Sequence, residues 1–293
     1  MPVSTGVSSR VSIGGNAFCF ASFEDSSTQE RVVNPSAICG SRDPIVQRVA
    51  TGRKLVQFQL THDATRPILD QLLALAGTTR TGAGTQASPW LYTANESVGT
   101  TEICVDKVGA KHKYTSCRLQ RLVLRGQVGT MPIQAESTWI ATDEIEDAAF
   151  SFVDGTVDNL IAFPGADLTV GGVAAAHDRY AIVIDNRLVP SWNASETVTD
   201  VGPGPRQVLL AFACPYIAAN KDHYWLNRAV TPRALSHRIT NGNDSLTFSM
   251  GYGVLVPQSP SVPGATEEIR INETWEAYRS GNDPAFTFSL YGT

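Results

Sequence analysis

The sequence is short of charged side chains. Asp, Glu, Lys and Arg make up 17% of its 293 residues, against about a quarter in an average soluble protein. The net charge of −5 argues against a protein that grips nucleic-acid phosphates through a basic surface. Glycine and proline are plentiful instead, with 24 and 16 residues, beside many Thr, Ser and Val. This composition favours short strands joined by turns.

Cysteine is also sparse, and its spacing is uninformative for metal binding. The five cysteines are Cys19, Cys39, Cys104, Cys117 and Cys214. They contain no Cys-x-x-Cys pair, which disfavours a zinc ribbon or a thioredoxin-like site. Cys104 and Cys117 could face each other across a hairpin, and we expect them to stay reduced.

Membrane and export signals are missing as well. No apolar run reaches 18 residues, and the first fifteen residues lack the basic-then-apolar pattern of a signal peptide. We therefore expect a soluble protein that is made in the cytosol and has no membrane partner.

Motifs of enzymes are the last notable absence. The sequence has no Gly-x-Ser-x-Gly elbow, Walker loop, His-Glu-x-x-His or EF-hand spacing. We expect no catalytic residue, no cofactor and no metal. One cluster leaves a β-rich glycoside hydrolase open as an alternative, although a solvated strand end is the simpler interpretation. Its four carboxylates are Glu267, Glu268, Glu273 and Glu276.

The first half of the chain shows a strand and then a helix. Residues 53–60 alternate apolar and polar side chains, with Phe58 and Leu60 on one face. Thr65 is a suitable N-cap, Pro67 fits the first helical turn, and a leucine stripe follows until Gly77. The stripe consists of Ile68, Leu69, Leu72, Leu73 and Leu75.

A polar segment and a hairpin follow. Residues 77–89, "GTTRTGAGTQASP", are predicted to be a long loop because they are polar and rich in glycine. Residues 116–141 are predicted to form a hairpin that turns at residues 126–129. On its return arm Ile133, Ala135 and Trp139 alternate with polar side chains.

The second half repeats this order. Residues 206–213 form a strand, residues 219–230 occupy the place of the helix, and residues 235–253 form a hairpin with a turn at residues 241–244. Aligning Arg206 with Arg53 without gaps places Leu226 at the position of Leu73. Strands at residues 267–278 and 285–292 complete the chain. We interpret the repeat as a duplication, with domains 1–160 and 161–293. The Gly- and Pro-containing segment 154–172 is the join, and the strand beginning at Tyr180 is the first of the second copy.

Three stretches then suggest a family. "YTSCRLQRLVLRGQVGTMPIQAESTWIA" opens a long hairpin, "YAIVIDNRLVPS" is a mid-chain strand, and "LTFSMGYGVLVPQSP" is a late strand. In their order and texture they resemble the two-domain tail tube proteins of long-tailed bacteriophages. The resemblance covers about residues 30–290 and rests on the order of elements without an invariant motif. Ser116 stands where the family usually has glycine.

The resemblance implies a mainly β protein of two tandem β-sandwich or barrel domains, each with one main helix. It further implies a structural virion protein, the major tail tube subunit, whose domains supply strands to a ring-shaped inner β-barrel. Three copies would form a pseudo-sixfold ring, and stacked rings would form a hollow conduit for DNA. Its partners would be further copies of itself and the tape measure, tail terminator and tail tip proteins. Double-stranded DNA would pass without specific binding, in a virion tail assembled in the host cytoplasm.

Two groups of residues are assigned roles on this basis. The polar faces of the hairpins are expected to line the channel. They comprise Gln134, Glu136, Thr138, Thr247 and Ser249. The segment from Gly77 to Pro89 is expected to be mobile in a free subunit and to become ordered against the neighbouring ring, with Gly82, Gly84 and Trp90 in the contact.

Two other classes of protein remain open beside the tail tube. A β-sandwich module of a phage or bacterium that binds carbohydrate or a receptor would expose aromatic side chains on a concave face. A glycoside hydrolase would bring two carboxylates to one cleft at a set separation.

Overall fold

The computed structural model describes residues 10–33, 49–107, 110–127, 130–153, 160–161, 166–215, 230–257 and 270–292. Within these ranges the chain is mainly β, with one helix, α1 (Arg66–Leu75), as expected from the composition. The strands before residue 100 are β1 (Arg10–Ile13), β2 (Asn16–Phe18), β3 (Ser22–Asp25), β4 (Thr28–Val33), β5 (Val49–Asp63), β6 (Thr78–Thr81) and β7 (Trp90–Ala94). Next come β8 (Thr100–Asp106), β9 (Lys111–Gln127), β10 (Thr130–Ala141) and β11 (Asp143–Glu146). None of the described helical residues forms a segment long and apolar enough to cross a membrane.

The strands after residue 160 are β12 (Ala166–Val170), β13 (Val173–Ala174), β14 (Arg179–Asp185), β15 (Val189–Ser191), β16 (Asp200–Gly202), β17 (Gln207–Pro215), β18 (Arg233–Asn241), β19 (Asp244–Leu255), β20 (Arg270–Ala277) and β21 (Thr287–Tyr291). Two of them, β12 and β13, precede Tyr180. The strand at Tyr180 is therefore not the first of the second half, because the segment predicted as an irregular join already contains β12. Residues 219–229 of the expected helix lie outside the described residues, and Val230 is in a turn.

One long antiparallel sheet joins the two halves of the chain. Its strands lie in the order β3, β5, β10, β9, β14, β17 and β20. The step from the first half to the second is β9 to β14, which pair from Arg121–Asp185 to Gln127–Arg179. The backbone hydrogen bonds between these two strands thus join residues that are more than fifty positions apart in the sequence.

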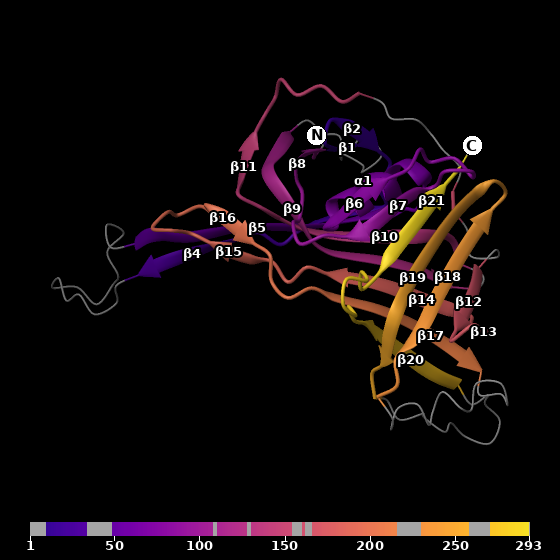
Figure 1. The fold of residues 1–293 in the computed structure, drawn as a ribbon. Helices are drawn as coiled ribbons and strands as arrows, with labels where there is room; N and C mark the ends of the chain where they lie inside the picture. The colour runs from indigo at the N-terminus through magenta and orange to yellow at the C-terminus, as the bar shows by residue number, and fades with distance from the viewer. Residues whose placement is uncertain are drawn as a thin grey trace, which may run out of the picture.

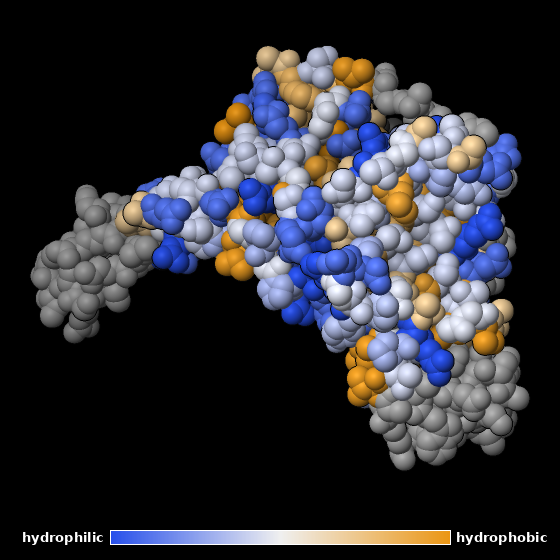
Figure 2. Space-filling view, in the orientation of Figure 1, coloured by the Kyte–Doolittle hydropathy of each residue, from blue (hydrophilic) through white to orange (hydrophobic). Residues whose placement is uncertain are grey.

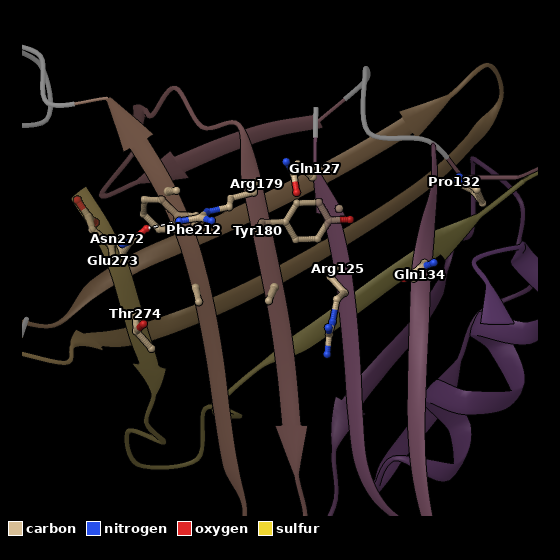
Figure 3. A pocket seen from close by; sticks show the side chains of 14 residues that line it. Arg125, Gln127, Pro132, Gln134, Arg179, Tyr180, Phe212, Asn272, Glu273 and Thr274 are labelled. Atoms are coloured by element: carbon tan, nitrogen blue, oxygen red, sulfur yellow. Dashed lines mark hydrogen bonds between the residues drawn. The ribbon is translucent and has the colours of Figure 1, made fainter. Parts of the chain in front are cut away.

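A second layer crosses behind this sheet. In it β19 lies between β18 and β21, β12 flanks β18, and β7 flanks β21. The end of β19, Gly253–Leu255, leaves this layer and pairs with β20 of the long sheet. Figures 1 and 3 show the strands of the two layers crossing at a steep angle. The sheet curls into two layers without closing into a barrel within the described chain.

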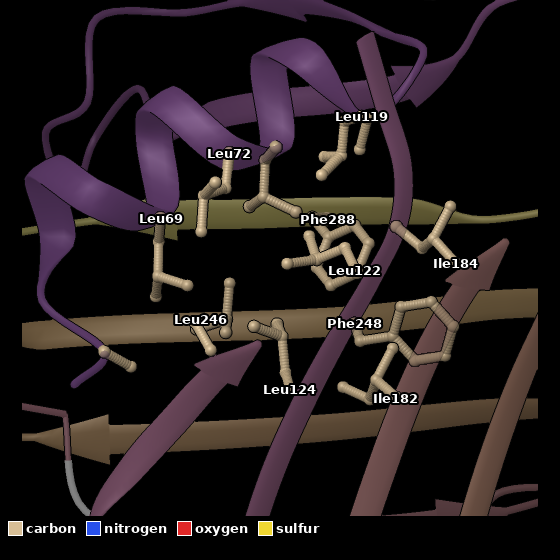
Figure 4. Close-up of a cluster of buried hydrophobic side chains, with 14 of the residues drawn as sticks. Leu69, Leu72, Leu119, Leu122, Leu124, Ile182, Ile184, Leu246, Phe248 and Phe288 are labelled. Carbon is tan, nitrogen blue, oxygen red and sulfur yellow. The ribbon is translucent and has the colours of Figure 1, made fainter. Parts of the chain in front are cut away.

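The core lies between the layers and under α1. Leu122, Leu124 and Ile182 from the long sheet meet Leu246 and Phe248 from the second layer (Figure 4). The helix is bounded as predicted, with Thr65 at the N-cap and a proline in its first turn, and Gly77 after it has φ +77°. Its buried residues are the predicted stripe Ile68, Leu69, Leu72, Leu73 and Leu75. The amphipathic pattern therefore located both the helix and its buried face.

An arm projects from this body (Figure 1). Its base is the first part of β5, paired with β4, and the hairpin of β15 and β16 packs against it. The indole Nε1 of Trp192 donates to the carbonyl oxygen of Lys54 at 3.1 Å, and Arg53 lies 5.2 Å from the Trp192 ring centroid. A segment of the second half therefore holds a strand of the first.

The predicted hairpins are confirmed. β9 and β10 pair across residues 128–129, and β18 and β19 pair from Asn241–Asp244 onward. Gly242 has φ +60° at the first central position of that two-residue loop, which a type II′ turn requires. Cys104 and Cys117 are buried free thiols, as expected.

Two buried tryptophans have the same local partner arrangement. The Trp139 indole Nε1 donates to Ser137 Oγ at 2.9 Å, and the Trp275 indole Nε1 donates to Glu273 Oε2 at 2.9 Å. Both rings are fully buried, so each indole N–H needs the acceptor two residues earlier on its own strand.

The Ser137→Ala variant removes the acceptor of Trp139 and leaves a buried N–H unsatisfied. We expect a loss of about 1–3 kcal/mol in the free energy of unfolding, measured by urea denaturation. The matched control is Thr138→Ala, one residue along, where the side chain faces outward and we expect a change within about 0.5 kcal/mol. Equal losses in the two variants would contradict the role of this hydrogen bond.

Two histidines meet in the second half. His177 Nε2 and His237 Nε2 lie 3.1 Å apart, and the His237 ring packs 4.1 Å from the Tyr180 ring centroid. Burial, reinforced by the neighbouring His177, lowers the pKa of His237 from 6.5 to about 3. Burial also lowers the pKa of His177, against the opposing pull of Asp178 and Asp167. Both rings are therefore neutral in the folded protein at pH 7.

The unfolded chain binds a proton at His237 below about pH 6.5, whereas the folded chain does so near pH 3. Stability should therefore fall as the pH drops through this window, by up to about 1.4 kcal/mol per pH unit for this residue. In urea denaturation between pH 6.5 and 4.5, we expect the His237→Gln variant to have the shallower dependence on pH. Parallel curves for the two proteins would contradict the assignment.

Candidate functional site

The outward face of the long sheet brings together polar residues from both halves. Three rows of side chains cross the strands from β5 to β20, and the third row ends at β17. The first row is Thr61, Glu136, Val123, Val183, Leu209 and Glu276. The second is Asp63, Gln134, Arg125, Ala181, Ala211 and Thr274. The third is Gln59, Thr138, Arg121, Asp185 and Gln207. The centre of the face is aliphatic, and its margins are polar.

Charges on this face are largely matched. Arg125 contacts Glu136 at 2.5 Å, and Arg121 lies opposite Asp185 on the neighbouring strand. The three rows hold two arginines, Arg121 and Arg125, and four carboxylates, Asp63, Glu136, Asp185 and Glu276. They therefore carry a small negative excess. Such exposed pairs contribute little to stability, roughly 0–1 kcal/mol each, so their arrangement matters more for what the face attracts.

A groove of about 560 Å³ runs along one end of the face (Figure 3). Ala181 and Ala211 lie on its floor, and Arg125, Gln134 and Asn272 line it. Arg179 donates from its guanidinium to Asn272 Oδ1 at 2.8 Å, which holds that side chain across the strands. The buried carboxylate among its lining residues, Glu273, accepts a hydrogen bond from the Trp275 indole. This lining is more typical of an open surface, along which solvent or a polar chain moves, than of a pocket that binds one small molecule.

The structure places the predicted channel residues on two different surfaces. Gln134, Glu136 and Thr138 lie on this outward face, and their neighbours Ile133, Ala135 and Trp139 are buried. Thr247 and Ser249 lie on β19, where Leu246 and Phe248 point into the core from the opposite layer. The alternation was predicted correctly in both strands. The five residues do not share one surface, however, because β10 and β19 face the core from opposite sides.

Several residues of this face were not singled out from the sequence. These residues are Arg121, Arg125 and Arg179. Two features of β9 hid the first two: its pairing with β10 shifts register between Thr138 and Trp139, and Val123, between the two arginines of β9, is buried. The sequence does place one arginine two residues before Val123 and another two residues after it, on the same face of the strand. The irregular register and the buried valine obscured this pattern.

The segment predicted as a loop, residues 77–89, contains a strand at its start, β6, and residues 82–89 form the loop that connects β6 to β7. β6 and β7 pair from Thr78–Ala94 to Thr81–Leu91. The tip is closed by hydrogen bonds from the Ala83 and Thr85 amides to the Ser88 carbonyl oxygen, at 3.0 and 3.2 Å. The loop prediction therefore holds for residues 82–89 and was wrong for Thr78–Thr81. Polar threonines on a short, solvent-facing hairpin look like loop residues in the sequence.

Within the hairpin the glycines and Trp90 are in contact with one another. A Cβ atom on Gly84, at φ +79°, would lie 2.5 Å from the Trp90 ring, and one on Gly82 would lie 2.0 Å from the Pro89 carbonyl oxygen. Arg66 and Arg80 lie 5.8 and 5.2 Å from the Trp90 ring centroid. Gly77 ends α1 before the hairpin begins. Trp90 is thus enclosed by its own subunit, with the exposed tip at residues 85–88 beyond it.

The carboxylates of the hydrolase alternative are not brought together. Glu273 is buried and accepts from Trp275, whereas Glu276 is on the outward face, where Gln207 and Tyr278 donate to it at 2.8 Å. Glu267 and Glu268 lie outside the described residues. Among the described residues, no group of three His, Cys, Asp or Glu side chains is arranged to hold a metal ion.

The chain matches no model of a known protein family and no curated protein.

Replacing Gly84 tests the enclosure of Trp90. Ala at this position strains the backbone and collides with the indole ring, so we expect Gly84→Ala to destabilise the protein by about 2 kcal/mol or more in urea denaturation. Gly172→Ala is the control, since Gly172 has φ +81° and open space around its Cβ position. It should cost about 1–2 kcal/mol through the backbone alone. An equal effect at both positions would mean that Trp90 does not pack on the tip.

Proposed function

We propose that this chain is a structural subunit of a bacteriophage tail tube, whose copies form rings around a hollow conduit for DNA. The observation that carries the proposal is the long sheet, which runs without a break through both halves of the chain. One face of this sheet is packed on the core, and the other is polar at its margins and nearly balanced in charge. A wall with these two faces suits an aqueous channel.

The two halves repeat the same set of strand pairings, which supports tandem domains at 1–160 and 161–293. In the first half β1 pairs with β2 and β8, β3 with β5, β5 with β10, and β9 with β8, β10 and β11. In the second half β12 pairs with β13 and β18, β14 with β17, β17 with β20, and β19 with β18, β20 and β21. The order along the chain is the same in both sets.

The buried tryptophans occupy matching places in this repeat. Trp139 lies opposite Phe58 of β5, and Trp275 lies opposite Leu210 of β17. Phe58 therefore corresponds to Leu210, which moves the ungapped alignment on Arg53 and Arg206 by one residue. This correction matters because a slip of one residue turns every side chain of a strand to the other face.

The number of strands in the long sheet is compatible with a closed ring of three copies. Each copy supplies seven strands to the long sheet, β3 included, so three copies supply three times seven, or twenty-one, before the end of β19 is counted. Barrels of roughly 16–18 strands already leave a water-filled channel. Three copies with two similar domains each also give a pseudo-sixfold ring, and closure removes the exposed sheet edges.

In this proposal the outward face of the long sheet lines the channel, with Gln134, Glu136 and Thr138 on its wall. Thr247 and Ser249, on the other layer, lie on the outside of the ring. The small negative excess on the inner wall disfavours counterion release and lets the duplex pass without binding. Stacking would use the exposed tip of the hairpin between β6 and β7. The tape measure, terminator and tip proteins would be partners of a tail assembled in the host cytoplasm.

The other candidate functions have less support. A hydrolase needs two carboxylates facing one cleft, and Glu273 and Glu276 point to opposite sides of β20. A sugar-binding face needs exposed aromatic rings, and the groove is lined by alanine, arginine and amide side chains, with Tyr180 and Phe212 buried. On the face seen in Figure 2, hydrophobic residues form small separate patches among polar ones.

Electron microscopy with cysteine labelling tests the proposal. In a background without the exposed Cys19 and without Cys39, single cysteines replace Thr138 or Ser249. Concentrated protein should form hollow tubes or stacked rings. In these particles a bulky maleimide should modify the cysteine at position 249 and spare the one at position 138, which faces the channel.

Free subunits provide the control, since both positions should react there at similar rates. Equal labelling of both positions in the tubes would show that the long sheet does not line the channel. Particles without a central hole, or a protein that stays monomeric at high concentration, would contradict the proposed function itself.

A further inference from the structure

Two strand pairings join the halves of the chain, and each covers the edge of a sheet. The first half contributes β9, which pairs along the outer edge of β14, and β7, which pairs along the outer edge of β21. In both pairings a strand of the first half covers an edge of the second half. The contact between the halves is therefore asymmetric.

The corresponding edges of the first half are those of β3 and β11, which hold the places of β14 and β21 in the repeat. Each has one partner: β3 pairs with β5, and β11 pairs with β9. Within the described part of the chain, no strand pairs with the other side of either one. The first half thus presents, uncovered, the same two edges that it covers on the second half.

Backbone groups on these edges point outward. The Ser26 amide donates to the Gln57 carbonyl oxygen at 2.9 Å, so by the alternation of an antiparallel ladder the amides of Phe23 and Asp25 face away from β5. Likewise the Asp147 amide donates to the Lys111 carbonyl oxygen at 2.9 Å, so the amides of Glu144 and Glu146 face away from β9. The Glu144 amide donates to Asp143 Oδ1 at 2.8 Å, and the Glu146 amide points toward the open side of the strand. Edges of this kind are templates for another strand.

The two open edges lie next to each other. Lys107 Nζ contacts Asp25 Oδ2 at 3.2 Å and Glu144 Oε1 at 3.3 Å, so one ammonium group bridges β3 and β11. His112 Nδ1 lies 2.8 Å from the same Glu144 oxygen. A single partner can therefore contact both edges at once.

We propose that these edges receive the second half of another copy of this chain, so that copies associate head to tail by repeating the contact between the two halves. The inference deepens the proposed function and rests on the tandem repeat described there. It names the surface and the partner: the edges of β3 and β11 on one copy, and residues 161–293 of the next. Because the two surfaces differ, the contact is heterologous and continues into a ring or a filament.

Photocrosslinking tests the partner. p-Benzoylphenylalanine replaces Glu146 of β11 or Glu24 of β3, both exposed, and the full-length protein is irradiated at assembling concentration. Crosslinked dimers should form, and peptide mapping should place the second attachment point in residues 161–293. The control position is Ala174 of β13, which is exposed on a strand that pairs with β12 and lies on neither of the two edges named above. It should give at least about tenfold less dimer than position 146, the ratio expected for a contact weaker by about 1.4 kcal/mol.

Proline variants test the edge itself. Glu146→Pro removes an outward-facing amide without removing a hydrogen bond inside the subunit, and we expect it to raise the concentration needed for assembly at least about tenfold. Ala174→Pro makes the same change at the control edge and should leave that concentration unchanged. Circular dichroism of dilute protein checks that both variants fold. If the Glu146→Pro protein is unfolded, the Glu146→Lys variant, which adds a charge of opposite sign to the same edge, takes its place.

Attachment within residues 1–160 would indicate a twofold contact and overturn the inference, while tubes in the micrographs would leave the proposed function standing. Attachment in residues 161–293 without hollow particles would support the head-to-tail contact and contradict the tube. A protein without crosslinked dimers at any concentration would overturn both.

Discussion

The pairing of β9 on both sides is the constraint on which the rest of the structure depends. Its C-terminal part hydrogen-bonds to β10 of the first half on one side and to β14 of the second half on the other. Both registers must be satisfied at once, because an unpaired backbone group in the middle of a sheet costs as much as a lost hydrogen bond. A shift of β9 by one residue would move Leu122 and Leu124 out of the core and place Arg121 and Arg125 into it. The position of each half relative to the other is therefore tied to the packing of a single strand.

From this constraint follows the two-sided character of the long sheet. Side chains alternate along most of β10, β14 and β17, so the residues that do not pack in the apolar core form the outward face. Those remaining residues are glutamine, threonine, matched charges and small aliphatic side chains. Neither the core nor the outward face belongs to one half. Leu124 meets Ile182 in the core, and Arg125 meets Ala181 outside, across the same pair of strands. The candidate wall of a channel is thus a product of the joint between the halves.

The hairpin of β6 and β7 fastens the second layer in the same way. β7 extends the sheet of β19 and β21, and its tip is closed around Trp90 by Gly84, where only a residue without a side chain fits beside the ring. One strand from the first half therefore completes each layer of the second. The directional nature of these two contacts gives the molecule different surfaces at its two ends, which is the property that a chain needs for open or ring-shaped assembly rather than for a closed pair.

Local pattern was sufficient for much of this fold. The helix with its buried leucines, the turn at Gly242, both long hairpins and the alternation of Gln134, Glu136 and Thr138 with buried neighbours follow from periodicity and turn chemistry, which depend on residues close in the sequence. The strand nature of Thr78–Thr81 did not, because its threonines become a strand only when β7 pairs with them and β21 supports β7. Tertiary structure alone decided that β9 joins β14, that Thr247 and Ser249 lie on the opposite layer from Gln134, and that Arg121, Arg125 and Arg179 share a face. Each of these depends on which distant strand supplies the second set of hydrogen bonds, and a sequence with period two specifies the two faces of a strand without specifying its neighbours.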